Sequence, residues 1–134
     1  MPFYRLAAMG QNEGKINPKL LSKSVAGEFM KAALVTRPEG EGNPLHMHPN
    51  EEQFLFVLEG KVHFILGDED RIIGPGELVH VPRYVYHRSR PVDGPAVTFS
   101  VKSPAGSGDM TEDYSKAEGA EDAEKLYPGN KSSS

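Results

Sequence analysis

Two histidines separated by one residue, His46 and His48, are side chains whose type and spacing could do chemistry. On an extended backbone, residues two apart project from the same face, so both imidazoles can reach one ion. Neutral imidazole is a common ligand for iron, zinc, nickel and copper. Two surface histidines in a loop have the same spacing, so the surrounding residues must decide whether the pair marks a metal site.

Composition limits the other kinds of chemistry. The chain has no cysteine, so a metal must be held by histidine, carboxylate, amide or carbonyl groups. A formal net charge of −4 argues against nucleic acid and anionic membrane surfaces as partners. The sequence has no apolar run near the ~20 residues of a membrane-spanning helix. The first residues also lack the basic start and apolar stretch of a secretory signal. We therefore expect a cytoplasmic protein.

The elements that must position the histidines are predicted to be strands. Fourteen glycines and 11 prolines divide the 134 residues into short apolar segments rich in Val, Ile, Phe and Tyr. This pattern favours an all-β, mainly antiparallel sandwich or small barrel. Strands are expected over residues 3–6, 20–24, 28–37, 53–58, 61–66, 71–74, 77–81, 84–89 and 96–103. Residues 53–58 and 61–66 are expected to form a hairpin closed by Glu59-Gly60.

Two spaced motifs surround the histidine pair. The first has gaps of five, one, four and six residues between Gly40, His46, His48, Gln53 and Gly60. The second has gaps of five and four residues between Gly76, Pro82 and His87. Together they resemble the two signatures of the cupin family, over residues 40–91. The resemblance implies a small conserved β-barrel of jelly-roll type with a ligand pocket at one mouth.

The resemblance divides the chain into three parts of one domain. Residues 1–39 would supply N-terminal strands, and residues 40–104 the core barrel with both motifs. Residues 105–134 would form a C-terminal extension with a short polar helix over 117–126. The end of this extension, residues 131–134, is expected to be disordered.

Cupins that bind metal use two histidines, a glutamate and a third histidine. The resemblance therefore implies one divalent transition metal, Fe, Mn, Ni or Zn, held by His46, His48, Gln53 and His87. Gln53 departs from the acidic residue of the family, and the neighbouring Glu52 is an alternative ligand. Strand alternation leaves both open because both faces of this segment are apolar. The spacing to Gly60 favours Gln53. The second motif also departs from the family pattern, at Tyr84 and Pro91.

Three imidazoles and one oxygen ligand would leave two neighbouring positions of an octahedron for water or substrate, as in a catalytic site. An amide in place of a carboxylate leaves the site more positive, which favours Lewis-acid chemistry over oxygen activation. We therefore predict an isomerase, lyase or cyclase acting on a small hydroxy- or keto-substituted molecule. The alternatives are an Fe(II)-dependent dioxygenase that cleaves a carbon–carbon bond, and a non-catalytic protein that binds a small ligand or metal.

Other polar residues near the motifs receive different interpretations. His63 and His80 lie outside the motif positions and are interpreted as partly buried structural histidines. Lys102 shares a polar face with Ser100 and Thr98, and such a face is more often solvated. The alternative is that this face lines the pocket and that Lys102 donates a proton. Tyr84 is expected in a turn that needs no positive φ, and the alternative is a phenol at the pocket mouth.

Charge and apolar patterning suggest two further features. Arg88 and Arg90 lie on the opposite face from His87 and are expected in surface salt bridges. The strand around Phe54 and Leu58 is apolar on both faces, which predicts a homodimer that covers the outer face.

Overall fold

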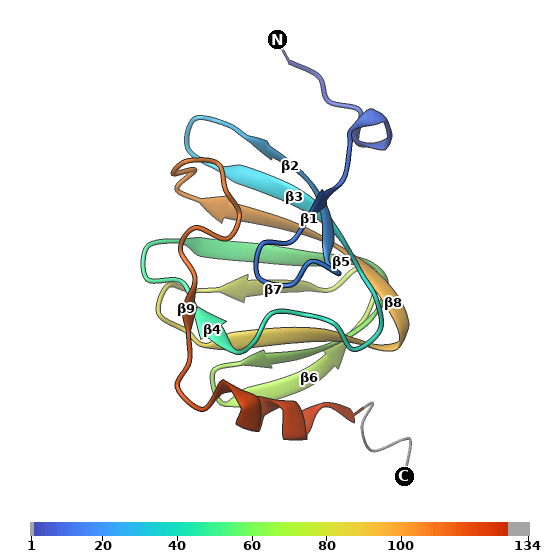
Figure 1. Ribbon diagram of the computed structural model, residues 1–134, viewed down its shortest axis with the longest axis vertical. Helices are drawn as coiled ribbons and strands as arrows, with labels where there is room; N and C mark the ends of the chain where they lie inside the picture. Colours follow the sequence, from blue (N-terminus) through green and yellow to red (C-terminus); the bar gives the residue numbers. More distant parts are fainter. Residues whose placement is uncertain (1, 129–134) are drawn as a thin grey trace.

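The computed structural model describes residues 2–128, whose main regular structure is antiparallel strands (Figure 1). The strands are β1 (Asn12–Glu13), β2 (Leu21–Ala26), β3 (Lys31–Arg37), β4 (His46–Met47), β5 (Glu52–Leu66), β6 (Glu69–Ile73), β7 (Leu78–Val81), β8 (His87–Ser103) and β9 (Ser115–Lys116). The helices are two 3-10 segments, η1 (Leu6–Ala8) and η2 (Ala120–Leu126). The all-β prediction is confirmed. The expected disordered tail, residues 131–134, lies outside the described residues.

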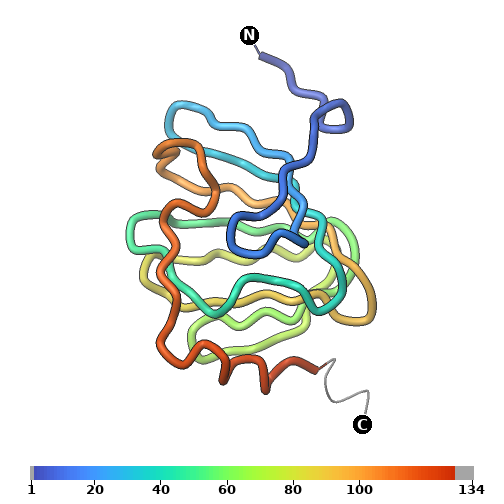
Figure 2. Tube along the Cα trace, in the orientation of Figure 1, coloured from blue at the N-terminus to red at the C-terminus, as the bar shows by residue number. Residues whose placement is uncertain are grey.

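The long strands β5 and β8 organise the sheet. Their antiparallel register runs from Glu52 opposite Ser103 to Leu66 opposite His87. β3 pairs with the C-terminal half of β8, while β7 and β6 pair with successive halves of β5. β1 and β2 extend the sheet beyond β3, and β4 lies between β8 and β9. The strands form one curled antiparallel sheet (Figures 1 and 2).

The expected hairpin between residues 53–58 and 61–66 is wrong, because both segments belong to β5. Register shifts against β8 on either side of Glu59 mark a bulge at this point. Gly60 has a φ of +83°, and a Cβ there would lie 2.3 Å from the carbonyl oxygen of Pro95. The glycine therefore permits close approach of two strands, and does not reverse the chain.

The expected break around Pro91 and Pro95 is wrong in the same way, since β8 continues through both prolines. Pro91 lies opposite Val62, and its carbonyl accepts hydrogen bonds from the Gly40 amide and the Tyr127 hydroxyl. Its missing N–H is tolerated because this part of β8 is irregular, with register shifts nearby. The expected strand over residues 3–6 is also absent.

The apolar core packs along both halves of β5. Its enclosed side chains are Leu55, Val57, Val62, Phe64, Ile73, Val81 and Ala96. Alternation along β5 places Leu55 and Val57 inward, so the same alternation directs Gln53 inward. The packed strands thus fix which side chains face the interior of the curled sheet.

The C-terminal segment returns to the sheet instead of leaving it. After β8 the chain runs alongside β4, where Lys116 of β9 lies opposite His46 (Figure 2). The predicted helix is shorter than expected and forms η2. Arg88 and Arg90 hold it through Glu124, with N–O distances of 3.3 and 2.7 Å. These arginines are buried, so the expectation of surface salt bridges is wrong about their location. Within residues 2–128, no helix is long and apolar enough to cross a membrane.

Candidate metal centre

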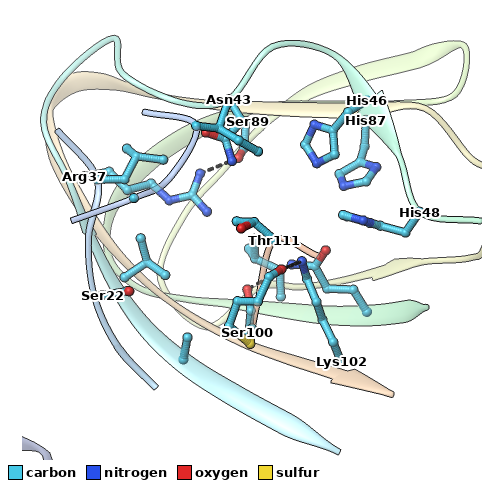
Figure 3. Close-up of a pocket in the computed structure, with 18 of the residues that line it drawn as sticks. Ser22, Arg37, Asn43, His46, His48, His87, Ser89, Ser100, Lys102 and Thr111 are labelled. Atoms are coloured by element: carbon cyan, nitrogen blue, oxygen red, sulfur yellow. Dashed lines mark hydrogen bonds between the residues drawn. The ribbon is translucent and has the colours of Figure 1, made fainter. Parts of the chain in front are cut away.

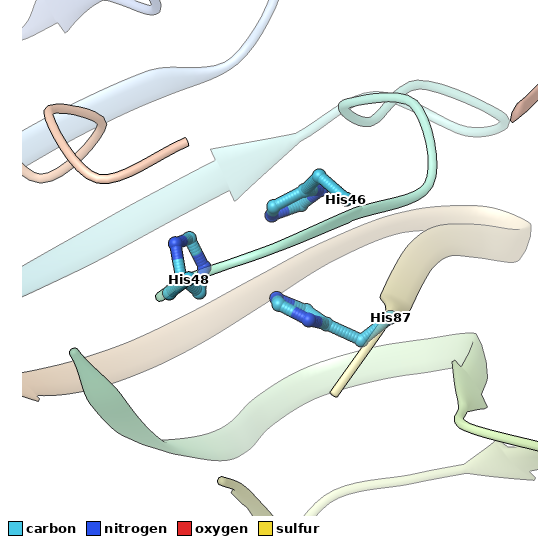
Figure 4. Close-up of side chains that lie close together, drawn as sticks. All are labelled: His46, His48 and His87. Carbon is cyan, nitrogen blue, oxygen red and sulfur yellow. The ribbon is translucent and has the colours of Figure 1, made fainter. Parts of the chain in front are cut away.

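The three motif histidines meet where β4 pairs with the start of β8. His46 lies directly opposite His87 in the antiparallel register. His48 follows two residues later and returns to the same side. The ring centroids are 4.3 Å apart for His46 and His87, and 4.9 Å apart for each pair that includes His48 (Figure 4). Backbone pairing therefore brings together two sequence motifs about 40 residues apart.

Each imidazole is oriented through its Nδ1 atom by a backbone carbonyl. The acceptors are the oxygens of Pro44 for His46 (2.7 Å), Asp113 for His48 (2.9 Å) and Val85 for His87 (3.0 Å). A carbonyl oxygen only accepts hydrogen bonds, so Nδ1 carries the proton in each ring. The neutral ring then keeps its lone pair on Nε2, the arrangement typical of histidines that bind metal.

The surroundings keep the three rings neutral. Burial lowers the pKa of His46 to about 2, of His48 to about 3 and of His87 to about 4. The positive charge of Lys102 contributes to all three of these shifts. At neutral pH the rings are therefore uncharged, and their Nε2 lone pairs are available to a cation.

The arrangement fits a divalent transition metal. The Nε2 atom of His48 is buried and has no hydrogen-bond partner among the described residues. One ligand atom from each of the three histidines lies within 4.8 Å of the other two. Two nitrogens bound to one ion at ~2.1 Å lie about 3–4 Å apart, so small side-chain rotations would complete the coordination. Three neutral nitrogens suit Fe, Mn, Ni or Zn.

The structure separates the two candidates for the oxygen ligand. Glu52 points outward, its side chain is 55% exposed, and it pairs with His80 at 2.9 Å. Gln53 is buried and lines the cavity beside the histidines. Its Nε2 donates to the Ser100 hydroxyl at 3.0 Å, while its Oε1 is buried without a partner. Of these two residues, Gln53 therefore offers the free oxygen on the inner face.

A cavity of about 120 Å³ lies beside the histidines, inside the curled sheet. Figure 3 shows the three imidazoles on one side, with Lys102 and Ser100 extending from β8. Lys102 donates to the carbonyl of Met110. Burial lowers the pKa of Lys102 to about 8, although its ammonium remains largely protonated at neutral pH. The structure thus places Lys102 and Ser100 on the inner face, and the expectation of a solvated face is wrong.

The other sequence interpretations have mixed outcomes. His63 is buried against Asp70 at 3.2 Å, apart from the motif histidines, whereas His80 is more exposed than expected. Tyr84 has a φ of 66°, so the expectation of an ordinary turn is wrong. Tyr84 is 61% exposed, and its backbone N–H donates to the His48 carbonyl at 3.0 Å. The strained turn therefore holds the backbone of a candidate ligand.

Sequence reasoning missed three residues of the site. Asp113 supplies the carbonyl that orients His48, and the Tyr114 ring stacks on His46 with centroids 4.5 Å apart. Both lie in the returning segment, which has no local signal linking it to the motifs. Arg37 lines the cavity from β3. Alternation along β3 places Lys31 and Arg37 on the same face, with only apolar residues between them on that face. Cations at both ends of an apolar strand face are a sequence signal that could have identified Arg37.

Residues 33–102, more than half of the chain, match the family model described as a cupin domain. The chain therefore belongs to the cupin family, as its two motifs indicate. Dimethylsulfoniopropionate lyase DddQ from Ruegeria pomeroyi is 37% identical over 71 residues, which cover 52% of this chain and 35% of the lyase. This chain thus spans about a third of the length of the curated relative that it matches.

Solved structures support the same fold at low sequence identity. KdgF from a Halomonas species aligns with a TM-score of 0.70 and 19% identity, covering 77% of this chain and 94% of KdgF. The polyketide cyclase RemF from Streptomyces resistomycificus aligns with a TM-score of 0.66 and 18% identity, covering 78% of this chain and 79% of the cyclase. These similarities establish the fold alone.

Proposed function

We propose that this protein is a metal-dependent enzyme with Lewis-acid chemistry, an isomerase, lyase or cyclase, acting on a small hydroxy- or keto-substituted molecule. The supporting observation is the convergence of three neutral imidazoles whose Nδ1 atoms are held by carbonyls. This leaves three Nε2 lone pairs for His46, His48 and His87 to offer one ion. Gln53 would complete the ligand set through its unpartnered Oε1.

When bound, the ion supplies Lewis acidity, which polarises a substrate oxygen and makes the adjacent C–H more acidic. The protein contributes orientation, since the carbonyl contacts prevent the rings from turning away. Gln53 contributes an oxygen without charge, so the ion's positive charge is not offset by a carboxylate. This charge balance favours Lewis-acid chemistry over the dioxygenase alternative.

Lys102 is the proposed proton-transfer residue. Its side chain is buried, lines the cavity and lies near enough to the histidines for its charge to lower their pKa values. The hydrogen bond to Met110 holds the ammonium in place. With a pKa lowered to about 8, a fraction of Lys102 is neutral at neutral pH, and this amine Nζ would accept the proton removed from the substrate carbon. The ammonium so formed would return the proton to the substrate. The lyase and cyclase among the similar proteins support this class of reaction, but the substrate is not inferred from them.

Metal analysis tests the site directly. Protein purified without chelators or a nickel column should contain about one ion per chain by inductively coupled plasma mass spectrometry. His87→Ala should lose most of this metal, while His80→Ala, a matched change outside the cavity, should retain it. Circular dichroism should show unchanged β structure in both variants. Full metal retention in His87→Ala would overturn the assignment.

Proton abstraction can be tested without knowing the substrate. Pyruvate, 3-hydroxypropionate and dimethylsulfoniopropionate are incubated with metal-loaded protein in D₂O, and exchange of their C–H groups is followed by proton NMR. We expect C–H exchange or elimination with at least one of these compounds. The Lys102→Met variant should lose this reaction while it retains the metal. Oxygen uptake with Fe(II) and a diketone, without such exchange, would favour the dioxygenase. Retained metal with neither reaction would favour a non-catalytic protein.

A further inference from the structure

The cavity carries a charge opposite to that of the chain. Among the residues that the structure describes, its lining contains Lys15, Arg37 and Lys102 but no aspartate or glutamate, although the chain has a net charge of −4. Lys15 is paired with Asp109 at the rim. Neither of the two deeper cations, Arg37 and Lys102, forms a salt bridge within residues 2–128. The charges of Glu51, Asp109 and Asp113 partly compensate Lys102, whereas no carboxylate does so for Arg37 among these residues.

Arg37 is the less satisfied of these two cations. It is 8% exposed, and its Nη1 donates to the Ser89 hydroxyl. Its Nε atom is buried without a partner, and Nη2 makes no hydrogen bond to any described residue. Arg90, by contrast, is paired with Glu124. A buried guanidinium without a counter-ion is costly, so this arrangement indicates an anion that the protein itself does not supply.

The guanidinium faces the same space as the histidines. Figure 3 shows Arg37 reaching inward from the side of the cavity opposite His46, His48 and His87. Its charge is close enough to His87 to lower the pKa of that imidazole. The hydroxyl that orients it belongs to Ser89, two residues after His87 on the same strand face. One strand therefore positions both a candidate ligand and the support for Arg37.

We propose that Arg37 is the substrate-carboxylate anchor of this cavity, so that the substrate is a small organic acid. The carboxylate of this acid would pair with Arg37. Its hydroxyl or keto oxygen would then lie on the histidine side of the cavity, a placement that rests on the proposed function. Lys102 adds further positive charge to the cavity. A carboxylate suits the site better than phosphate does. A multiply charged phosphate is usually bound by several donors, whereas this cavity of about 120 Å³ offers one incompletely paired guanidinium, which matches a single carboxylate.

Binding of matched probes tests the anchor. Glycolate and glycolamide differ only in replacing the carboxylate by a neutral amide, and both are titrated into metal-loaded full-length protein by calorimetry. Arg37→Met should weaken glycolate binding about 10-fold or more, as expected for loss of a charged hydrogen bond, and leave glycolamide binding unchanged. Arg37→Lys should restore part of the affinity. The control Arg83→Met removes an exposed arginine outside the cavity and should change neither.

Stability separates a ligand anchor from a structural arginine. Without ligand, Arg37→Met should melt at the same temperature as the wild type or higher, because it removes an uncompensated buried charge. A lower melting temperature combined with unchanged glycolate affinity would overturn the inference. So would tighter binding of inorganic phosphate than of glycolate, or no binding of glycolate to the wild type at millimolar concentration.

Metal content measured on the same samples distinguishes this inference from the proposed function. Glycolate binding that is independent of Arg37, in protein with its metal intact, overturns the anchor alone. Glycolate binding that depends on Arg37, in protein that never retains metal, supports the anchor and overturns only the metal-dependent function.

Discussion

Replacement of Lys31 by methionine is expected to destabilise the protein far more than a typical surface change. The side chain of Lys31 is fully enclosed, and its Nζ lies 2.6 Å from Glu51, 2.8 Å from Glu112 and 2.6 Å from the Asp109 carbonyl oxygen. Burial lowers the pKa of Lys31, but hydrogen bonds with Glu112 and Glu51 outweigh it and raise the pKa above its usual value. The folded protein therefore holds this lysine charged.

The magnitude follows from what the substitution leaves behind. Glu51 is 3% exposed, and its Oε1 already lacks a partner. Without Lys31 its carboxylate would be a buried charge with no directly bonded counter-ion, and breaking such a pair costs about 3–5 kcal/mol. At roughly 3–4 °C per kcal/mol for a chain of this size, the melting temperature should fall by about 10–20 °C. Urea unfolding followed by circular dichroism measures the free-energy change.

A double variant provides the control. Lys31→Met combined with Glu51→Met removes both charges and should recover most of the lost stability, because a buried pair replaced by apolar groups of similar volume is often neutral. The reasoning is refuted if Lys31→Met alone changes the free energy of unfolding by less than about 1 kcal/mol, the range of solvated surface pairs.

The same substitution should also weaken the metal site. The segment anchored by Lys31 through Asp109 and Glu112 carries Asp113, whose carbonyl orients His48. Loss of an interaction that orients a ligand typically lowers metal affinity about 10- to 100-fold. Competition with a chromogenic chelator would measure the change, and an unaltered affinity would show that the segment is held by other contacts.

Three further predictions concern the bulge, acid stability and assembly. Gly60→Ala should destabilise the protein by at least about 1–2 kcal/mol, because it places a Cβ at φ +83° and 2.3 Å from a carbonyl oxygen; wild-type stability in urea would contradict the bulge. Hydrogen bonds from Lys31 and Ser107 lower the pKa of Glu112 from 4.5 to about 2, so its stabilising effect is present above about pH 4.5 and is lost as the pH falls towards 2. Glu112→Gln should flatten the pH dependence of the urea midpoint in that window, and parallel curves would disprove the coupling. The half-exposed side chains of Phe54 and Leu58 on the outer face predict a homodimer; elution at monomer mass at micromolar concentration in gel filtration would rule it out.

The sequence could predict the candidate ligands because their geometry is largely local. His46 and His48 share a face by alternation alone, and motif spacing added His87 and Gln53. Motif spacing favoured Gln53 over Glu52, but strand alternation could not separate them, because both faces of this strand are apolar. The two faces differ in burial, since Leu55 is enclosed while Phe54 is 44% exposed, and no local pattern records that difference.

The remaining contacts depend on pairings that are distant in the sequence. Asp113 and Tyr114 reach the histidines only because the segment after β8 returns to pair with β4. The charge of Arg37 could be read from the sequence, but its lack of a partner could not. That property depends on which acidic residues fold away from the cavity, and this is decided by tertiary packing.

The wrongly predicted breaks in β5 and β8 bear directly on the site. Local turn propensity at Gly60 and Pro91 suggested separate short strands, but pairing of the two long strands with each other overrides it. Because β8 is continuous, it carries His87 at one end and Lys102 near the other, and its curvature brings both to one cavity. β5 pairs with both ends of β8: its first half lies opposite the end with Lys102, and its second half lies opposite the end with His87. The bulge at Gly60 lies between these two halves of β5. A change at Gly60 should therefore disturb the relative placement of His87 and Lys102, although neither residue contacts it, and metal affinity should fall in Gly60→Ala together with stability.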